Sequence, residues 1–405
     1  MSWPRSSVLL AIGMVLVAAN LRPAAAGIGP LIDRIKSDTG LSDAGADVLV
    51  ALPVLCFGAL APLAPALVRR FGVRPTIAGA LALLLVGLLV RLLPGLGFLF
   101  VGTAIAGTAI AVGNVLLPVL VRGNFPDRVG LVTGIYSTAL IGFAALAAGV
   151  SVPVANAFGG GWRPGLAVWA IPAAVALAVW APQFARRRDS GRSAAGDQVA
   201  GARSLLHDRV AWAVTMFFAI QSAGFYATLA WLPSVFHSHG ASTSRAGLLL
   251  SIALIAGLIP ALAVPTFAAR TRDQRAFVCV FVAIIATGWI GVIVAPMSVP
   301  YLWVVLLGFG QNAAFPLALT LIVLRGGTVT STAGLSTLVQ TVGYVIAAMA
   351  PFAIGAVHDI TGSWTPALFV LLALLVPQLI FGLAAARNRV VVPAGAGRLP
   401  ALDRA

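Results

Sequence analysis

Residues 97–121 read GFLFVGTAIAGTAIAVGNVLLPVLV, a run of 25 residues without a charged side chain. A helix that crosses the hydrocarbon core of a bilayer needs about 20 mainly apolar residues, so this run is long enough to span a membrane. Similar runs between charges and Pro/Gly punctuation predict eleven further spans, at residues 8–31, 45–68, 76–93, 129–155, 162–182, 210–235, 245–268, 276–296, 299–324, 331–355 and 364–386. The sequence therefore predicts an all-α integral membrane protein with twelve transmembrane helices.

The composition agrees with a membrane protein and leaves little chain for anything else. Of the 405 residues, 60% are hydrophobic and only 9% are charged, and the mean hydropathy is +1.02. Soluble domains carry about 25% charged residues. Twelve spans joined by short loops use up the chain, so we expect no catalytic domain outside the membrane and no enzyme.

The first span also imitates a secretory signal peptide. Arg5, the apolar residues 8–19 and the small residues 24–26 have the order of such a signal. However, Arg22 would lie between the apolar core and the cleavage site, and the apolar stretch resumes toward Leu31. We therefore expect a retained first span.

The basic residues predict the orientation, because positive charge concentrates in cytoplasmic loops. With the N-terminus inside, 20 of the 26 basic residues fall in cytoplasmic segments, and Arg22 lies within a helix. The remaining five fall outside: Arg34, Lys36, Arg91, Arg163 and Arg245. We therefore expect both termini to be cytoplasmic and the protein to lie in the inner (cytoplasmic) cell membrane. The net charge of +15 does not indicate nucleic acid, because no basic soluble face or motif accompanies it.

The chain divides into two halves that resemble each other. At a constant offset of 198 residues, Pro62, Asn114, Pro118 and Pro153 correspond to Pro260, Asn312, Pro316 and Pro351. Such a parallel duplication predicts two pseudo-symmetric six-helix bundles that flank a site near the midplane. We expect bundles at residues 1–185 and 209–390, a cytoplasmic linker at 186–208 and a tail at 391–405. The Arg-rich linker is either a flexible connection or a segment that binds anionic lipid headgroups.

Arg22 is the most informative residue for function. It lies about 4 Å from the middle of the first span, where a charge costs about 2.5–3.5 kcal/mol, and no carboxylate is expected at that depth. Pro23 follows immediately, and Gly27, Gly29 and Pro30 loosen the same helix further. A broken helix beside a buried cation indicates either contact with an anionic ligand or a structural role in a polar cavity.

Amide and phenol side chains at comparable depth complete the candidate substrate site. Asn20 precedes Arg22 by two residues, about 200° around a regular helix, so both face one cavity only if the kink redirects one of them. The other candidates occur in both halves: Asn114, Tyr136, Gln221, Tyr226, Gln311, Asn312, Gln340 and Tyr344. Each one alone could simply bond between helices, for about 0.6 kcal/mol. Their repetition in both halves favours substrate binding.

The sequence offers no cluster of metal ligands, no paired carboxylates and no phosphate-binding loop, so we expect no metal and no cofactor. The usual intramembrane carboxylate for proton coupling is also missing. An anion that enters a cell at 100 mV, inside negative, faces about 2.3 kcal/mol per charge. Uptake would therefore need exchange, consumption inside, or a proton carried by a flanking Asp or His, so that proton coupling stays open.

Several motifs resemble known families. Arg69-Arg70-Phe71-Gly72-Val73-Arg74, after the second span, is similar to the loop motif of the major facilitator superfamily, except that Arg69 occupies the acidic position. Three more segments resemble its cyanate and 2-nitroimidazole transporter branch: Asn20-Leu21-Arg22-Pro23 with Gly29-Pro30-Leu31, Gly113-Asn114-Val115-Leu116-Leu117-Pro118, and Thr133-Gly134-Ile135-Tyr136. The resemblance implies a transporter of a small planar anion or azole.

Taken with the resemblance, the residues predict a secondary active or facilitative transporter that works by alternating access. Its expected substrate is a small anionic or polar planar solute, cyanate-like or nitroimidazole-like, drawn to Arg22. Two alternatives remain: efflux of a neutral drug-like compound, and a non-transporting membrane receptor on the same fold.

Overall fold

The computed structural model describes residues 5–185 and 204–392, and within these ranges the regular structure is helical, with no strand. Eleven segments are long and apolar enough to cross a membrane, and a bent pair of helices makes a twelfth. This count confirms the twelve predicted spans.

The first six spans form the N-terminal bundle. Their helices are α1 (Arg5–Asn20), α2 (Pro23–Ala26), η1 (Gly29–Leu31) and α3 (Ile32–Thr39); α4 (Asp43–Ala59) and α5 (Leu63–Phe71); α6 (Val73–Val90); α7 (Leu96–Asn124); η2 (Pro126–Arg128) and α8 (Val129–Ala157); and α9 (Trp162–Ala167) and α10 (Ala170–Ala185).

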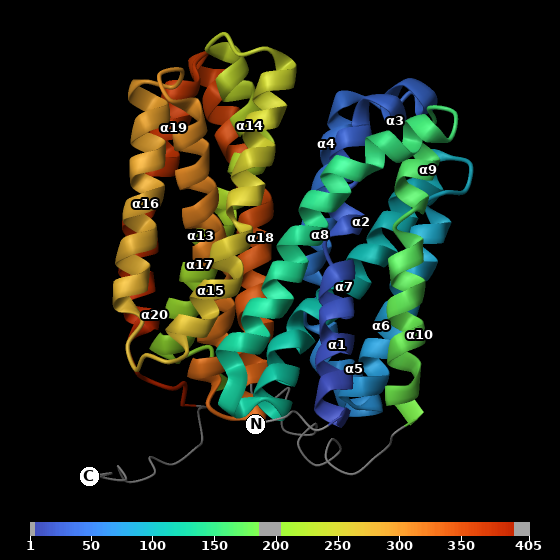
Figure 1. The fold of residues 1–405 in the computed structure, drawn as a ribbon, viewed down its shortest axis with the longest axis vertical. Coiled ribbons are helices and arrows are strands. Elements are labelled where there is room, and N and C mark those ends of the chain that lie inside the picture. The colour runs from blue at the N-terminus through green and yellow to red at the C-terminus, as the bar shows by residue number, and fades with distance from the viewer. Residues whose placement is uncertain (1–4, 186–203, 393–405) are drawn as a thin grey trace.

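The last six spans form the C-terminal bundle beside it (Figure 1). Their helices are α13 (Arg209–Ser238); α14 (Thr243–Ala256) and α15 (Leu258–Ala268); α16 (Arg275–Val294); α17 (Pro300–Gly326); α18 (Val329–Thr361); and α19 (Trp364–Ala373) and α20 (Leu375–Ala386). Most of the expected linker, and the tail from residue 393 on, lie outside the described residues. The last linker residue, Asp208, caps α13 by accepting a hydrogen bond from the Ala211 amide at 2.8 Å.

Breaks in the helices occur at corresponding places in the two bundles. The second span bends by 56° between α4 and α5, just before Leu63, and its counterpart breaks between α14 and α15 at Gly257. Pro62 and Pro260, which the repeat pairs, lie at these two breaks. A proline removes a helix hydrogen bond and clashes with the preceding turn, so the repeated prolines explain why the helix is interrupted at corresponding positions in both bundles.

The two bundles contact each other mainly in the half of the molecule that carries the described chain ends, and their ribbons diverge toward the opposite end (Figure 1). Helix α8 packs closely against α15 there: a Cβ added at Gly134 would lie 2.5 Å from the Leu262 carbonyl oxygen. The Ser336 hydroxyl donates to the Val115 carbonyl at 3.0 Å, and Arg122 bonds the Gly327 carbonyl. One end of the interface between the bundles is therefore closed.

Candidate functional site

Arg22 lies between α1 and α2, where the first span is broken. Helix α1 ends at Asn20, and Pro23, which has no amide hydrogen to donate, starts the one-turn helix α2. The Arg22 guanidinium reaches the C-terminal bundle, where Nη1 donates to the Tyr226 hydroxyl at 2.5 Å and Nη2 to the Tyr344 hydroxyl at 3.1 Å. One side chain thus connects the N-terminal bundle with α13 and α18.

Aromatic rings surround this cation. The Arg22 Cζ atom lies 5.3 Å from the centroid of the Phe315 ring and 5.9 Å from those of Phe57 and Tyr344, within the range of cation–π attraction. Phe57 and Phe218 both pack edge-to-face on Tyr344, with centroids 5.4 and 5.2 Å away, and so hold its hydroxyl in place. We call Phe57, Phe218, Tyr226, Phe315 and Tyr344 the aromatic box.

The site combines a cation with neutral donors and flat apolar surfaces. Within the described chain, Arg22 forms no ion pair, and its guanidinium has five N–H groups, of which these two contacts use two. Tyr226 and Tyr344 accept from Arg22 and keep their own O–H groups as donors. Arg22, Tyr226 and Phe315 are half-buried, whereas the other rings are buried. The arrangement can therefore bind a small planar group that accepts hydrogen bonds.

A second group of candidate residues lies where the bundles meet. The Gln340 amide nitrogen donates to the Asn114 backbone carbonyl at 2.7 Å and to the Ser336 hydroxyl at 3.0 Å. The side-chain nitrogen of Asn114 and the hydroxyl of Tyr136 are buried and have no hydrogen-bond partner among the described residues. Gln340 thus joins α18 to α7, while Asn114 and Tyr136 keep unused polar atoms.

A third group lies inside the C-terminal bundle. The Gln221 amide donates to the Gln311 backbone carbonyl at 3.2 Å, and the Gln311 amide donates to the Thr228 hydroxyl at 2.8 Å. The Asn312 side chain fills the break at Gly257, where an added Cβ would lie 2.5 Å from it. Two cavities of about 10 Å³ border Gln311, each with room for about one water molecule. These amides mainly hold helices α13, α14, α15 and α17 together.

Asn20 points away from Arg22. Its amide nitrogen donates to the Leu16 carbonyl at 2.8 Å and to the Pro172 carbonyl on α10 at 3.1 Å. The kink after α1 therefore does not bring both side chains to one ligand. Within residues 5–185 and 204–392, no three His, Cys, Asp or Glu side chains lie close enough to hold a metal ion.

Sequence reasoning missed two features near the site. Phe57, Phe218 and Phe315 stand among 20 phenylalanines, and a phenylalanine in an apolar span carries no polar atom that would mark a binding site. Arg91, expected in an outer loop, instead has a completely buried side chain. Its position at the end of a span, directly before Leu92 and Leu93, was the only available signal.

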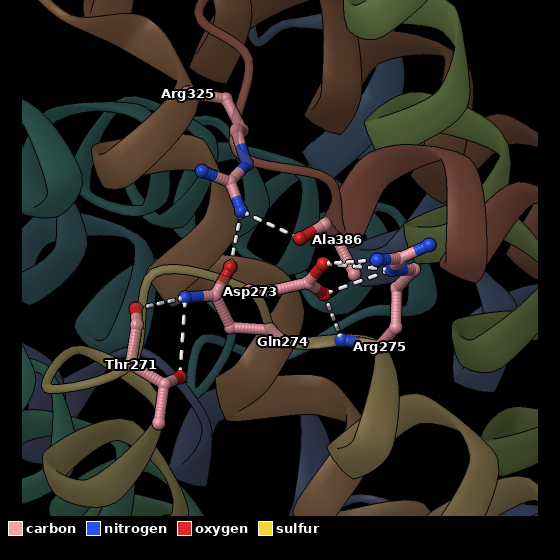
Figure 2. A network of polar contacts seen from close by, with 6 residues as sticks. All are labelled: Thr271, Asp273, Gln274, Arg275, Arg325 and Ala386. Carbon is pink, nitrogen blue, oxygen red and sulfur yellow. Dashed lines mark hydrogen bonds and ion pairs between the residues drawn. The ribbon is translucent and has the colours of Figure 1, made fainter.

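A separate polar network joins the loop before α16 to the ends of α17 and α20 (Figure 2). The buried Arg325 at the end of α17 bonds the Gln274 side chain and the Ala386 carbonyl. Arg275, the first residue of α16, donates to Asp273 in the preceding loop, and this hydrogen bond lowers the pKa of the Asp273 carboxyl. All these groups bond to one another or to helix ends, so the network is structural.

Known proteins resemble this chain over nearly its whole length. The model of the major facilitator superfamily matches residues 8–348. An uncharacterized transporter of Bacillus subtilis, YycB, is 37% identical over 386 residues, which is 95% of both chains. The 2-nitroimidazole transporter of Escherichia coli is 36% identical over 95% of this chain and 97% of its own, and the cyanate transport protein CynX of E. coli is 32% identical over 87% and 90%.

A solved structure shares the fold. The proton:xylose symporter XylE, bound to 6-bromo-6-deoxy-D-glucose, superposes with a TM-score of 0.77 at 16% identity and covers 96% of this chain and 98% of its own. Two six-span bundles, the family match and these transporter relatives agree with one another. The chain therefore belongs to the major facilitator superfamily and is a multi-pass membrane transporter of a small solute.

Proposed function

We propose that the transported solute is small, planar and either anionic or electron-rich, and that Arg22 and the aromatic box bind it. The observation that carries this proposal is the Arg22 guanidinium, which has no carboxylate partner in the described chain and is held by the hydroxyls of Tyr226 and Tyr344. A cation within a membrane span and without a counter-ion attracts negative charge, and a cationic solute would be repelled.

The chemistry of the box suits a flat solute. A carboxylate, nitro group or cyanate oxygen can accept hydrogen bonds from the free N–H groups of Arg22 and from the two tyrosine O–H groups. A conjugated ring can stack on Phe315, which is half-buried and lies closest to the guanidinium. The names of two relatives, a 2-nitroimidazole transporter and a cyanate transport protein, support solutes of this kind.

The position of the site between the bundles supports alternating access. Arg22 comes from one bundle and its hydroxyl partners from the other, so rocking of the bundles opens the site first to one side and then to the other. By the distribution of basic residues, the closed end of the interface is the cytoplasmic end of a protein in the inner cell membrane. The site in this conformation then faces outward.

The other candidate residues receive different roles in this proposal. Asn114 and Tyr136 keep unpaired polar atoms and become accessible to solute when the bundles separate at the closed end. Gln340 acts as a contact between the bundles. Gln221, Gln311, Asn312 and Asn20 orient helices around the box, because their amides are bonded inside their own bundles.

Flux into liposomes tests the proposal. We expect saturable transport of labelled 2-nitroimidazole or cyanate by the wild type, and a loss of about 10- to 100-fold in kcat/KM for Arg22→Gln, as charged hydrogen bonds contribute about 1.5–3 kcal/mol. Arg34→Gln is the control, since Arg34 bonds Gly160 and Asn156 at an exposed site. Repeating the assay with an imposed proton gradient tests proton coupling.

Two outcomes would overturn the proposal. If Arg22→Gln transports the solute as the wild type does, Arg22 does not bind the solute. Absence of flux for both probes, together with export of a larger neutral compound, would favour efflux instead.

A further inference from the structure

Arg91 is a second cation inside the N-terminal bundle, and the proposed function does not use it. It follows the last residue of α6, and its side chain is completely buried. Its Nη1 donates to the Ala24 carbonyl at 2.9 Å and its Nη2 to the Leu166 carbonyl at 3.1 Å, while its Nε has no partner in the part of the chain that the structure describes. No carboxylate in the described residues pairs with it.

Both acceptors are carbonyls that lack a helical hydrogen bond because they lie at helix breaks. Within a continuous helix the Ala24 carbonyl would accept from the Ile28 amide, but that amide bonds Ala25 at 3.2 Å because α2 ends at Ala26. Leu166 lies in the last turn of α9, just before the sixth span breaks. Arg91 therefore replaces missing helix hydrogen bonds at two breaks at once.

The surroundings accommodate the Arg91 backbone closely. A Cβ added to Gly102 on α7 would lie 2.4 Å from the Arg91 amide nitrogen, so a larger residue there would displace Arg91. An arginine buried without a carboxylate is costly, and an apolar side chain of similar volume often stabilises a protein as well or better. An apolar residue could not replace the guanidinium here, because the planar fork of the guanidinium donates to two carbonyls in fixed directions.

Helix α2, whose Ala24 carbonyl Arg91 bonds, directly follows Arg22, which is its N-cap residue. The Arg22 carbonyl accepts from the amides of Ala25 and Ala26 at 3.1 and 2.9 Å, so Arg22 and Ala24 belong to the same single turn. A helix of one turn has little stability of its own, so its position depends on tertiary contacts. Any movement of the Ala24 end of this turn also moves the Arg22 end.

We propose that Arg91 is a positioning residue for solute binding: by clamping the Ala24 and Leu166 carbonyls it fixes α2, and thereby the Arg22 guanidinium, in the aromatic box. This inference rests on the proposed function, because it assigns Arg91 a role in binding through Arg22. It predicts that Arg91 affects affinity only while Arg22 is present.

The test uses the full-length protein in lipid nanodiscs, with the variants Arg91→Met, Arg91→Lys, Arg22→Gln and Arg22→Gln/Arg91→Met. Arg34→Met serves as the matched control, because Arg34 also donates to a backbone carbonyl, that of Gly160, but at an exposed site. Two quantities are measured: the Kd for 2-nitroimidazole and for cyanate, and the rate of amide hydrogen exchange in residues 23–31, with helix α16, which carries no residue of the aromatic box, as an internal reference.

We expect Arg91→Met to accelerate exchange in residues 23–31 and to raise the Kd by about 10- to 100-fold, as small misplacements of a binding group do. Arg91→Lys keeps the charge but has a single donor nitrogen in place of the guanidinium fork, and should give an intermediate Kd and exchange rate. In the Arg22→Gln background, Arg91→Met should cause no further loss, because residues that act through one another are not additive. Arg34→Met should behave as the wild type.

The outcomes separate this inference from the proposed function. Unchanged exchange in residues 23–31 for Arg91→Met, or an equal loss of affinity with and without Arg22, would overturn the positioning role. If Arg22→Gln loses binding while Arg91→Met retains it, only the positioning role fails. If Arg22→Gln binds both probes as the wild type does, the proposed function fails. Should Arg91→Met not fold, Arg91→Lys and its exchange rate decide in the same way.

Discussion

The Arg22 guanidinium and the Tyr344 hydroxyl lie 3.1 Å apart although 322 positions separate them in the chain. The cation belongs to the N-terminal bundle and the hydroxyl to the C-terminal bundle, so this hydrogen bond exists only while the bundles keep their present arrangement. A solute that binds both groups has a different affinity for each arrangement of the bundles. Such a difference is what a ligand needs to shift a conformational equilibrium.

Removing either hydroxyl should weaken solute binding. Tyr226→Phe and Tyr344→Phe each delete a hydrogen bond to a charged group, worth about 1.5–3 kcal/mol, and free Arg22 to adopt other rotamers. We expect the KM for 2-nitroimidazole uptake to rise about 10- to 100-fold in each variant. Tyr301→Phe is the control, since Tyr301 is 46% exposed and lies beside Arg245. Wild-type KM values in both variants would show that these hydroxyls do not bind the solute or position Arg22 for it.

Phe315 should determine which solutes are carried. Phe315→Leu removes the ring nearest to Arg22, whose cation–π attraction is worth about 0.5–2 kcal/mol, and also removes a stacking surface. We expect the kcat/KM ratio of 2-nitroimidazole to cyanate to fall, because only the aromatic solute loses the stacking. Competition uptake measures this ratio. Phe369→Leu, at a ring that is 53% exposed, should leave it unchanged, and an unchanged ratio in Phe315→Leu would argue against stacking.

Gly134 should be needed to close the interface between the bundles. A methyl group at this position would lie 2.5 Å from the Leu262 carbonyl oxygen, and such overpacking costs about 1–3 kcal/mol. We expect Gly134→Ala to separate α8 from α15 and to reduce transport. Spin labels at Asp127 and Arg272, both exposed near this end, would report a longer distance.

Gly149→Ala on the same helix is the matched control, because nothing lies within 4 Å of its added Cβ. If both alanine variants show the wild-type distance and flux, the close contact at Gly134 is not required for closure.

Arg325 should stabilise the C-terminal bundle without affecting solute affinity. Arg325→Met releases the Ala386 carbonyl and the Gln274 side chain (Figure 2). It also releases the Ala385 carbonyl. We expect the free energy of unfolding to fall by about 1.5–3 kcal/mol, measured by chemical denaturation in detergent. Arg389→Met removes an exposed arginine and should have no effect. A changed KM with unchanged stability would contradict a purely structural role.

Much of the fold could be predicted from the sequence because the bilayer imposes a length on every helix. Charged residues such as Arg122 and Arg209 mark where spans end, so twelve spans follow from hydropathy alone. Pro62 and Pro260 likewise predict the paired helix breaks, since a proline cannot donate the backbone hydrogen bond that a continuous helix needs. The broken helix at Arg22 was predictable for the same local reason.

The site was only partly predictable. Arg22 stands out because a charge in hydrocarbon is rare, and Tyr226 and Tyr344 stand out as phenols in apolar spans. Phe57 and Phe315 do not stand out, because a phenylalanine in a membrane helix fits lipid, helix packing or a binding site equally well. Asn20 and Gln221 looked like Arg22's neighbours by depth, yet their amides bond within their own bundles.

The sequence by itself therefore determined the membrane location, the number of spans, the duplicated halves and the broken helix that carries Arg22. These properties depend on hydrophobicity and backbone hydrogen bonding, which act over one helix at a time. Only the tertiary structure decided which rings surround Arg22, which amides turn inward and what holds Arg91. Those properties depend on how each helix is rotated against its neighbours, and that rotation is set by contacts between residues up to hundreds of positions apart.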